Sequence, residues 1–163
     1  RPDTLGVKYS ELGLSDHVHA IGHLGENRAS NGWTGHQARM EIEKLHLKEI
    51  ANMAKKFDSI PEGDGTMLDN TMIVYMSDAG EAHHGALHER PFLIVGGGGG
   101  RLSIPGHYIM MPEYGQVGHR TIGNLYTSIL NAYGDPIGHF GDPDFELERE
   151  GLPQRGPVDS LMS

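Results

Sequence analysis

Residues 72–95 have the sequence MIVYMSDAGEAHHGALHERPFLIV, and this stretch carries the pattern from which the fold class is predicted. A short apolar run stands at each of its ends, over residues 72–76 and 92–95. Continuous apolar runs of this length are typical of strands that are covered on both faces, as in a parallel sheet flanked by helices. The stretch therefore predicts a strand–loop–strand segment over 71–96 in an α/β fold with a largely parallel sheet.

Two helices are predicted on either side of this segment. Thr34 and Gln37 have the spacing of a capping box, and apolar residues recur behind them at helical spacing, which predicts a helix over 35–57. A second apolar periodicity that stops at Gly134 predicts a helix over 121–133. Helices that alternate with buried strands are the usual composition of an α/β domain.

The length of 163 residues suits one domain with a core of its own. Residues 1–141 are predicted to form this domain, and residues 1–33 within it form a loop region rich in His and Gly. Residues 142–163, rich in Pro, Gly and charge, are predicted to be a tail on its surface.

Composition excludes several classes of function. The chain has no cysteine, which removes disulfides, thiolate catalysis and cysteine-based zinc sites. Its formal net charge of −9 makes general nucleic-acid binding unfavourable, because phosphates would be repelled. No apolar run approaches the roughly 20 residues that span a bilayer, so no membrane insertion is expected.

Eleven histidines form the outlying feature, and seven of them fall within residues 16–36 and 78–88. The second cluster begins with Asp78, directly after a predicted strand, where ligands bind in open α/β sheets. Carboxylates and imidazoles are donors that Zn²⁺, Mn²⁺ or Fe²⁺ accept, so both clusters predict metal binding. The alternative is that Asp78 caps a turn and the histidines are solvated loop residues.

Anion binding is predicted at His119 and Arg120, because they precede the helix over 121–133, where free N–H groups and the helix dipole attract negative charge. Gly96 to Gly100 lack the Lys-Ser/Thr of a phosphate-binding loop, and we interpret them as a flexible turn.

Four segments together resemble a known group of proteins: 69–78, 88–97, 124–130 and 140–142. Their order is similar to the C-terminal half of secreted bacterial families of unknown function that are related to alkaline phosphatases and sulfatases. The resemblance implies an α/β/α sandwich with metals at the strand ends. It also implies a periplasmic or secreted location.

The resemblance further implies two metal sites with zinc, or alternatively manganese, iron or calcium. The first would use Asp16, His19 or His23, and His88, which we therefore expect to lie close together. The second would use Asp78. Ala79 stands where the family has a histidine, and the candidates to replace it are His83, His84 and Glu81.

The family's nucleophile belongs to an N-terminal strand that this sequence does not contain. The resemblance thus implies a metal-dependent hydrolase of phosphate or sulfate esters that another polypeptide or an N-terminal segment completes, pairing with the strand at 71–76. The alternative is a non-catalytic metal-binding subunit or interaction module, and a homo-oligomer is a further expectation. A third hypothesis is a loop-rich domain whose histidines have no function.

Overall fold

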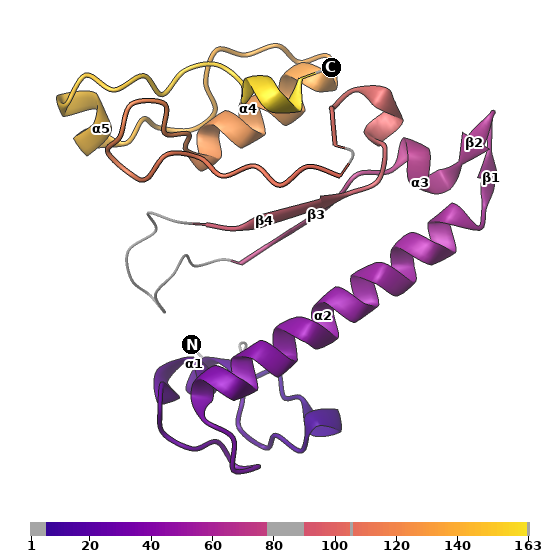
Figure 1. Cartoon of the computed structure of the whole chain (residues 1–163), viewed down its shortest axis with the longest axis vertical. Coiled ribbons are helices and arrows are strands. Elements are labelled where there is room, and N and C mark those ends of the chain that lie inside the picture. Colours follow the sequence, from indigo (N-terminus) through magenta and orange to yellow (C-terminus); the bar gives the residue numbers. More distant parts are fainter. Residues whose placement is uncertain (1–5, 78–89, 105, 163) are drawn as a thin grey trace. The chain divides into compact units, whose positions relative to one another are not determined.

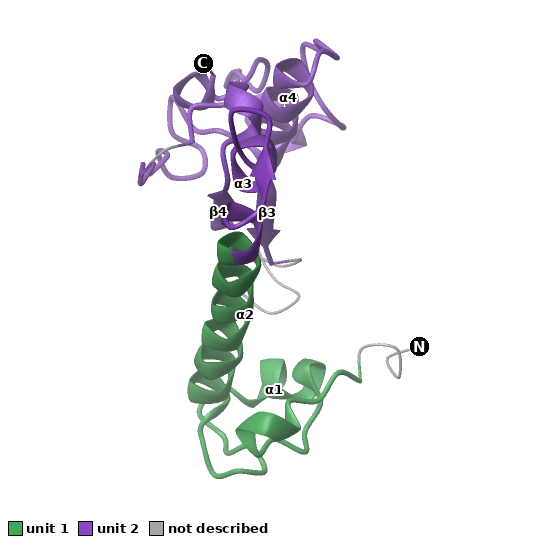
Figure 2. Ribbon diagram, turned by 90° about the vertical axis from the view of Figure 1, so that its right-hand side faces the viewer, with its two compact units in different colours: residues 1–55 green, residues 56–163 purple. Residues whose placement is uncertain are grey.

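The computed structural model describes residues 6–77, 90–104 and 106–162. The chain divides into two compact units, Arg1–Lys55 and Lys56–Ser163 (Figure 2). The sequence had suggested one domain over 1–141 with a tail behind it.

Unit 1 contains η2 (Ser10–Leu12), α1 (Val18–Leu24) and most of α2 (Gly35–Asp58) (Figure 1). The capping box expected at the start of α2 is present. The Gln37 backbone N–H donates to Thr34 Oγ1 at 3.1 Å, and the Thr34 N–H donates to Gln37 Oε1 at 2.9 Å. These two bonds satisfy N–H groups that the first helical turn leaves without a partner.

The core of unit 1 is small and joins both helices to the loops around them. It consists of Leu14, Ile21, Ala29, Ala38 and Ile42. Only the first half of α2 contributes buried side chains, and its later turns have none. The core therefore fixes α1 against the start of α2.

Gly35 lets α2 begin directly beside the end of α1. A Cβ at this position would stand 2.6 Å from Leu24 Cβ and 2.9 Å from the Gly25 nitrogen. Both distances are shorter than van der Waals contact, so a larger residue would push the two helices apart.

Unit 2 holds the remaining elements in short pieces. These are β1 (Pro61–Glu62), β2 (Gly65–Thr66), α3 (Met67–Asn70), β3 (Ile73–Met76), β4 (Phe92–Val95), η3 (Gly98–Gly100), α4 (Ile122–Ala132), α5 (Phe145–Arg149) and η4 (Asp159–Leu161).

The prediction of a largely parallel sheet in an α/β/α sandwich is wrong. β3 and β4 lie where strands were expected, but they pair antiparallel, with Ile73 opposite Val95 and Met76 opposite Phe92. The other sheet that the structure describes, β1 with β2, is also two-stranded and antiparallel. An apolar run indicates that a strand is buried, but it does not show whether the strand runs parallel or antiparallel to its neighbour. Residues 77–91, which link β3 and β4, are numerous enough for a parallel or an antiparallel pair.

The C-terminal residues are packed against α4 through polar contacts. Asn124 Nδ2 donates to the carbonyl oxygens of Gln154 at 2.8 Å and Gly156 at 2.7 Å. The Val158 N–H donates to Ser128 Oγ at 2.7 Å. Residues 142–163 also contain α5 and η4, and Leu147 in α5 is buried. This segment thus contributes Leu147, Gln154 and Val158 to the interior of unit 2, while more than half of its described residues are exposed.

The glycine run after β4 is shaped by close backbone approach. A Cβ on Gly97 would collide with the Asp69 carbonyl oxygen, and one on Gly96 with that of Thr71. Gly96 also has a φ of 105°, a conformation that favours glycine. These two glycines are required where β4 passes the end of α3.

Candidate metal centre

α1 places three histidines of the first cluster on or beside one short helix. His17 is its N-cap, and its Nδ1 accepts a hydrogen bond from the Ala20 N–H at 3.2 Å. His19 and His23 lie four residues apart, so they share one face of the helix. Their ring centroids are 4.9 Å apart and the rings meet edge to face at 76°. The His19–His23 pair is the closest approach of two imidazoles on α1.

Two imidazoles at this spacing can bind the same metal ion. A His–metal bond is about 2.0–2.1 Å long, so neighbouring rings on one helical turn can both reach an ion placed between them. The same four-residue spacing positions two histidines in helical zinc motifs. His19 is half-buried and His23 is exposed.

His17 is close to this pair but chemically unsuited to join it. Its ring lies 6.3 Å from that of His19 and is nearly parallel to it, at 26°. Since Nδ1 already accepts from Ala20, the proton of the neutral ring is on Nε2. Neither nitrogen then offers a lone pair to a metal.

Asp16, a predicted ligand of the first metal, is used in fixing a loop. Its Oδ2 accepts a hydrogen bond from the Ser30 N–H at 2.6 Å, while Ser30 Oγ accepts from the Ser15 N–H at 2.9 Å. The hydrogen bonds from Ser30 are the main reason why the pKa of the Asp16 carboxyl is lowered from its ordinary value. Within residues 6–77, 90–104 and 106–162, no three His, Asp or Glu side chains come together as a metal site.

This role of Asp16 predicts a pH dependence. Because the folded-state pKa is lowered, the carboxylate stabilises unit 1 above the ordinary pKa of 3.8, and this contribution is lost as the pH falls through the lower folded value. We expect Asp16→Asn to destabilise unit 1 at about pH 7 and to make a smaller difference at about pH 3. Urea unfolding followed by the fluorescence of Trp33 measures both. A difference that does not change with pH would contradict this role.

The predicted second metal site falls on residues 78–89, which lie outside the described residues. This concerns Asp78, His84 and His88, and also the candidate substitutes Glu81 and His83. The expected proximity of His88 to the first cluster stays a prediction for the same reason.

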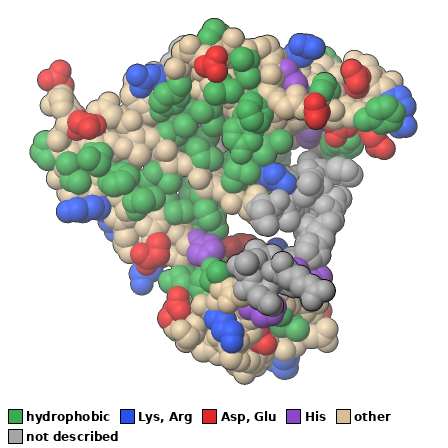
Figure 3. Space-filling model, turned by 180° about the vertical axis from the view of Figure 1, so that it is seen from behind, with side chains coloured by type: hydrophobic (Ala, Val, Ile, Leu, Met, Phe, Trp, Pro, Cys, Tyr) green, Lys and Arg blue, Asp and Glu red, His purple; other side chains and the backbone are tan. Residues whose placement is uncertain are grey.

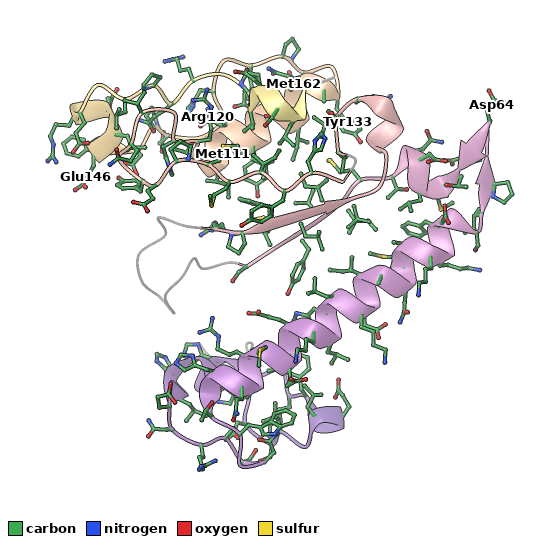
Figure 4. All side chains as sticks on the ribbon, viewed as in Figure 1. Asp64, Met111, Arg120, Tyr133, Glu146 and Met162 are labelled. Atoms are coloured by element: carbon green, nitrogen blue, oxygen red, sulfur yellow. The ribbon has the colours of Figure 1, made fainter. Side chains whose placement is uncertain are left out.

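His119 and Arg120 are engaged in the structure of their own loop. The His119 Nδ1–H donates to the Pro112 carbonyl oxygen at 2.9 Å, and the ring meets Tyr114 edge to face at 5.5 Å. Arg120 Nη1 donates to the His119 carbonyl oxygen at 3.4 Å (Figure 4). Anion binding at these residues stays a prediction.

Sequence reasoning missed α1 and therefore the geometric importance of the His19–His23 spacing. Residues 1–33 were predicted to be a loop region because they are rich in Gly, His and Asn, and α1 within them has only 7 residues. The available signal was Val18, Ile21 and Leu24 at helical intervals around the two histidines.

Comparisons with protein-family models, curated proteins and solved structures found no match to this chain. Among the described residues, no helix is both long enough and apolar enough to cross a membrane. The geometry of α1 is consequently the starting point for a functional assignment.

Proposed function

We propose that this chain is a metal-binding module in which His19 and His23 of α1 hold one divalent transition-metal ion, zinc in the first place. The observation that supports the proposal is the pair of imidazoles, four residues apart, with ring centroids separated by 4.9 Å. Imidazole is a preferred ligand of Zn²⁺, and the cysteine-free sequence leaves His, Asp and Glu as its usual protein ligands.

The rigidity of α1 supports this assignment. Ile21, between the two histidines, is fully buried in the core of unit 1, and the N-cap bond of His17 fixes the first turn. Ligands held in place before binding lose less conformational entropy when the ion arrives. The pair is thus better prepared for a metal than two histidines on a solvated loop.

A binding role is favoured over catalysis by the number of ligands. A catalytic zinc site has three protein ligands and an open position for water, whereas a helical pair supplies two. The described residues add no third ligand beside it. Ester hydrolysis requires further ligands and a nucleophile, and its predicted residues Asp78 and His88 lie outside the described part of the chain.

Calorimetric titration of the full chain with Zn²⁺ tests the proposal. We expect saturable binding of one ion per chain, and a loss of roughly tenfold or more in affinity for His19→Gln and for His23→Gln. His36→Gln is the matched control, because His36 is an exposed histidine of unit 1 outside α1 whose Nε2 lies 3.6 Å from Glu26 Oε1. Unchanged binding by the double variant would refute the assignment.

Catalysis is tested in the same preparation. The zinc-loaded chain is incubated with an aryl phosphate and an aryl sulfate, with and without a chelator. We expect no turnover by the chain alone. If the chain hydrolyses either ester and the chelator abolishes this activity, the chain is a metal-dependent hydrolase, as the sequence resemblance implies, and the proposed binding role is wrong.

A further inference from the structure

The sheet formed by β3 and β4 is apolar on both faces and yet none of its side chains is buried. All eight residues of the two strands are hydrophobic. Seven of them are half-buried, and Leu93 has 38% of its surface exposed. Strands of this composition normally lie inside a sheet with both faces covered. A sheet of two strands is also marginally stable without further strands or packing.

The register separates the two faces of this sheet. Met76 and Phe92 stand opposite each other on one face, and the Tyr126 hydroxyl of α4 donates to Met76 Sδ at 3.5 Å. Tyr75 and Leu93 stand opposite each other on the second face, because side chains alternate along a strand. The first face is thus the one in contact with α4, and the second carries the exposed Leu93.

Hydrophobic side chains gather on the surface drawn in Figure 3. The exposed large hydrophobic residues of unit 2 include Leu93 and, in the segment before α4, Tyr108 and Met110, with 91% and 81% of their surfaces exposed. Large exposed apolar areas on a protein surface mark interaction sites. Leu93 differs from the other two because it lies in a strand, where a partner can add backbone hydrogen bonds to apolar contact.

The distribution of formal charge between the two units indicates which charge a binding partner should carry. Residues 1–55 contain equal numbers of acidic and basic side chains, so the formal charge of −9 lies within residues 56–163, the unit that holds the sheet. A second copy of the chain would bring two strongly acidic units together, and this repulsion acts within the Debye length of about 8 Å in physiological salt. A partner with basic flanks is attracted instead.

We propose that the β3–β4 sheet is the docking surface for an extended apolar segment of another polypeptide, flanked by Lys or Arg. The segment adds to the sheet as a strand, with its apolar side chains on the face that carries Leu93 and its basic flanks attracted by the net negative charge of residues 56–163. The inference is independent of metal binding, because no histidine of α1 takes part in it.

A displayed random-peptide library, selected on the full chain, tests this surface. We expect the enriched peptides to combine β-branched or aromatic residues with flanking Lys or Arg. Their affinity should fall roughly tenfold or more for Leu93→Lys, which places a charge on the apolar face and repels basic flanks. Leu93 is already exposed, so the variant keeps its fold, which circular dichroism checks.

Leu93→Thr is the second variant, because threonine favours a strand and carries no charge. It should weaken the same peptides less than Leu93→Lys does. The proposal is overturned by a selection without enrichment, by enrichment of acidic peptides, or by binding that neither variant changes. Dimerisation of the chain itself that Leu93→Lys abolishes would also overturn it, in favour of a second copy as the occupant.

Discussion

Replacing Asn124 by alanine is expected to lower the free energy of unfolding of unit 2 by about 2–4 kcal/mol. Asn124 is completely buried, and its amide group donates to the carbonyl oxygens of Gln154 and Gly156. Its Oδ1 accepts from the Thr121 N–H at 2.8 Å and so caps the start of α4. Alanine removes all of these bonds. The Gly156 carbonyl and the Thr121 N–H lose this partner, at a cost of about 1–3 kcal/mol for each group left unpaired, while the Gln154 carbonyl keeps the bond from His139 Nδ1 at 3.1 Å.

Hydrogen exchange of the α4 amides under native conditions measures this loss, because it reports on unit 2 alone. Asn70→Ala is the matched control, since Asn70 is exposed and donates one hydrogen bond to Glu62 Oε2 at 2.8 Å. The control is expected to cost less than about 0.5 kcal/mol. Equal losses for the two variants would show that the C-terminal segment does not depend on Asn124.

Zinc is expected to stabilise unit 1 by about 2.7 kcal/mol when its free concentration is 100 times the dissociation constant. The ion binds the folded α1, where His19 and His23 are held together, and binds the unfolded chain less well. The single tryptophan of the chain, Trp33, packs against the core of unit 1 and reports the unfolding of this unit. Urea unfolding followed by Trp33 fluorescence, with and without zinc, therefore measures the effect.

The variant His19→Gln/His23→Gln should lose this stabilisation, whereas His36→Gln should keep it. Since unfolded histidines also bind zinc, a stabilisation retained in the double variant would mean that other ligands hold the ion. A destabilisation by zinc in the unmodified chain would mean that the unfolded state is the better ligand.

The two long helices could be predicted from the sequence because their signals are local. The predicted 35–57 and 121–133 correspond to α2 at Gly35–Asp58 and α4 at Ile122–Ala132. In both, apolar residues recur at helical spacing, and α2 has its cap pattern at Thr34. Local hydrogen bonds and a repeated apolar face suffice to define such elements.

The sheet direction and the packing of the C-terminal residues could not be predicted, because they depend on contacts far apart in the sequence. The apolar runs located β3 and β4 but carried no information about their relative direction. Leu147 and Val158 are buried, but they stand among Pro, Gly and charged residues without a regular period. The Gln154 carbonyl and the Val158 N–H are bonded by Asn124 and Ser128 of α4, about 30 residues earlier in the chain.

The metal-site hypothesis for the first cluster came from the number of its histidines and stays a prediction. Asp16 was expected to bind the same metal as His19 or His23. The Asp16 carboxylate accepts a hydrogen bond from the Ser30 N–H, 14 residues further along the chain. No local sequence pattern predicts this contact. The loop that brings Ser30 back to Asp16 is visible only in the folded unit.

The most direct test of metal binding by α1 is an NMR measurement of the imidazole nitrogens of the full chain during addition of zinc. We predict that one ring nitrogen of His19 and one of His23 change their chemical shifts together and saturate at one ion per chain. The nitrogens of His36 and of the hydrogen-bonded His46 should stay unchanged. Shifts confined to other histidines, with those of His19 and His23 constant, would contradict the central claim.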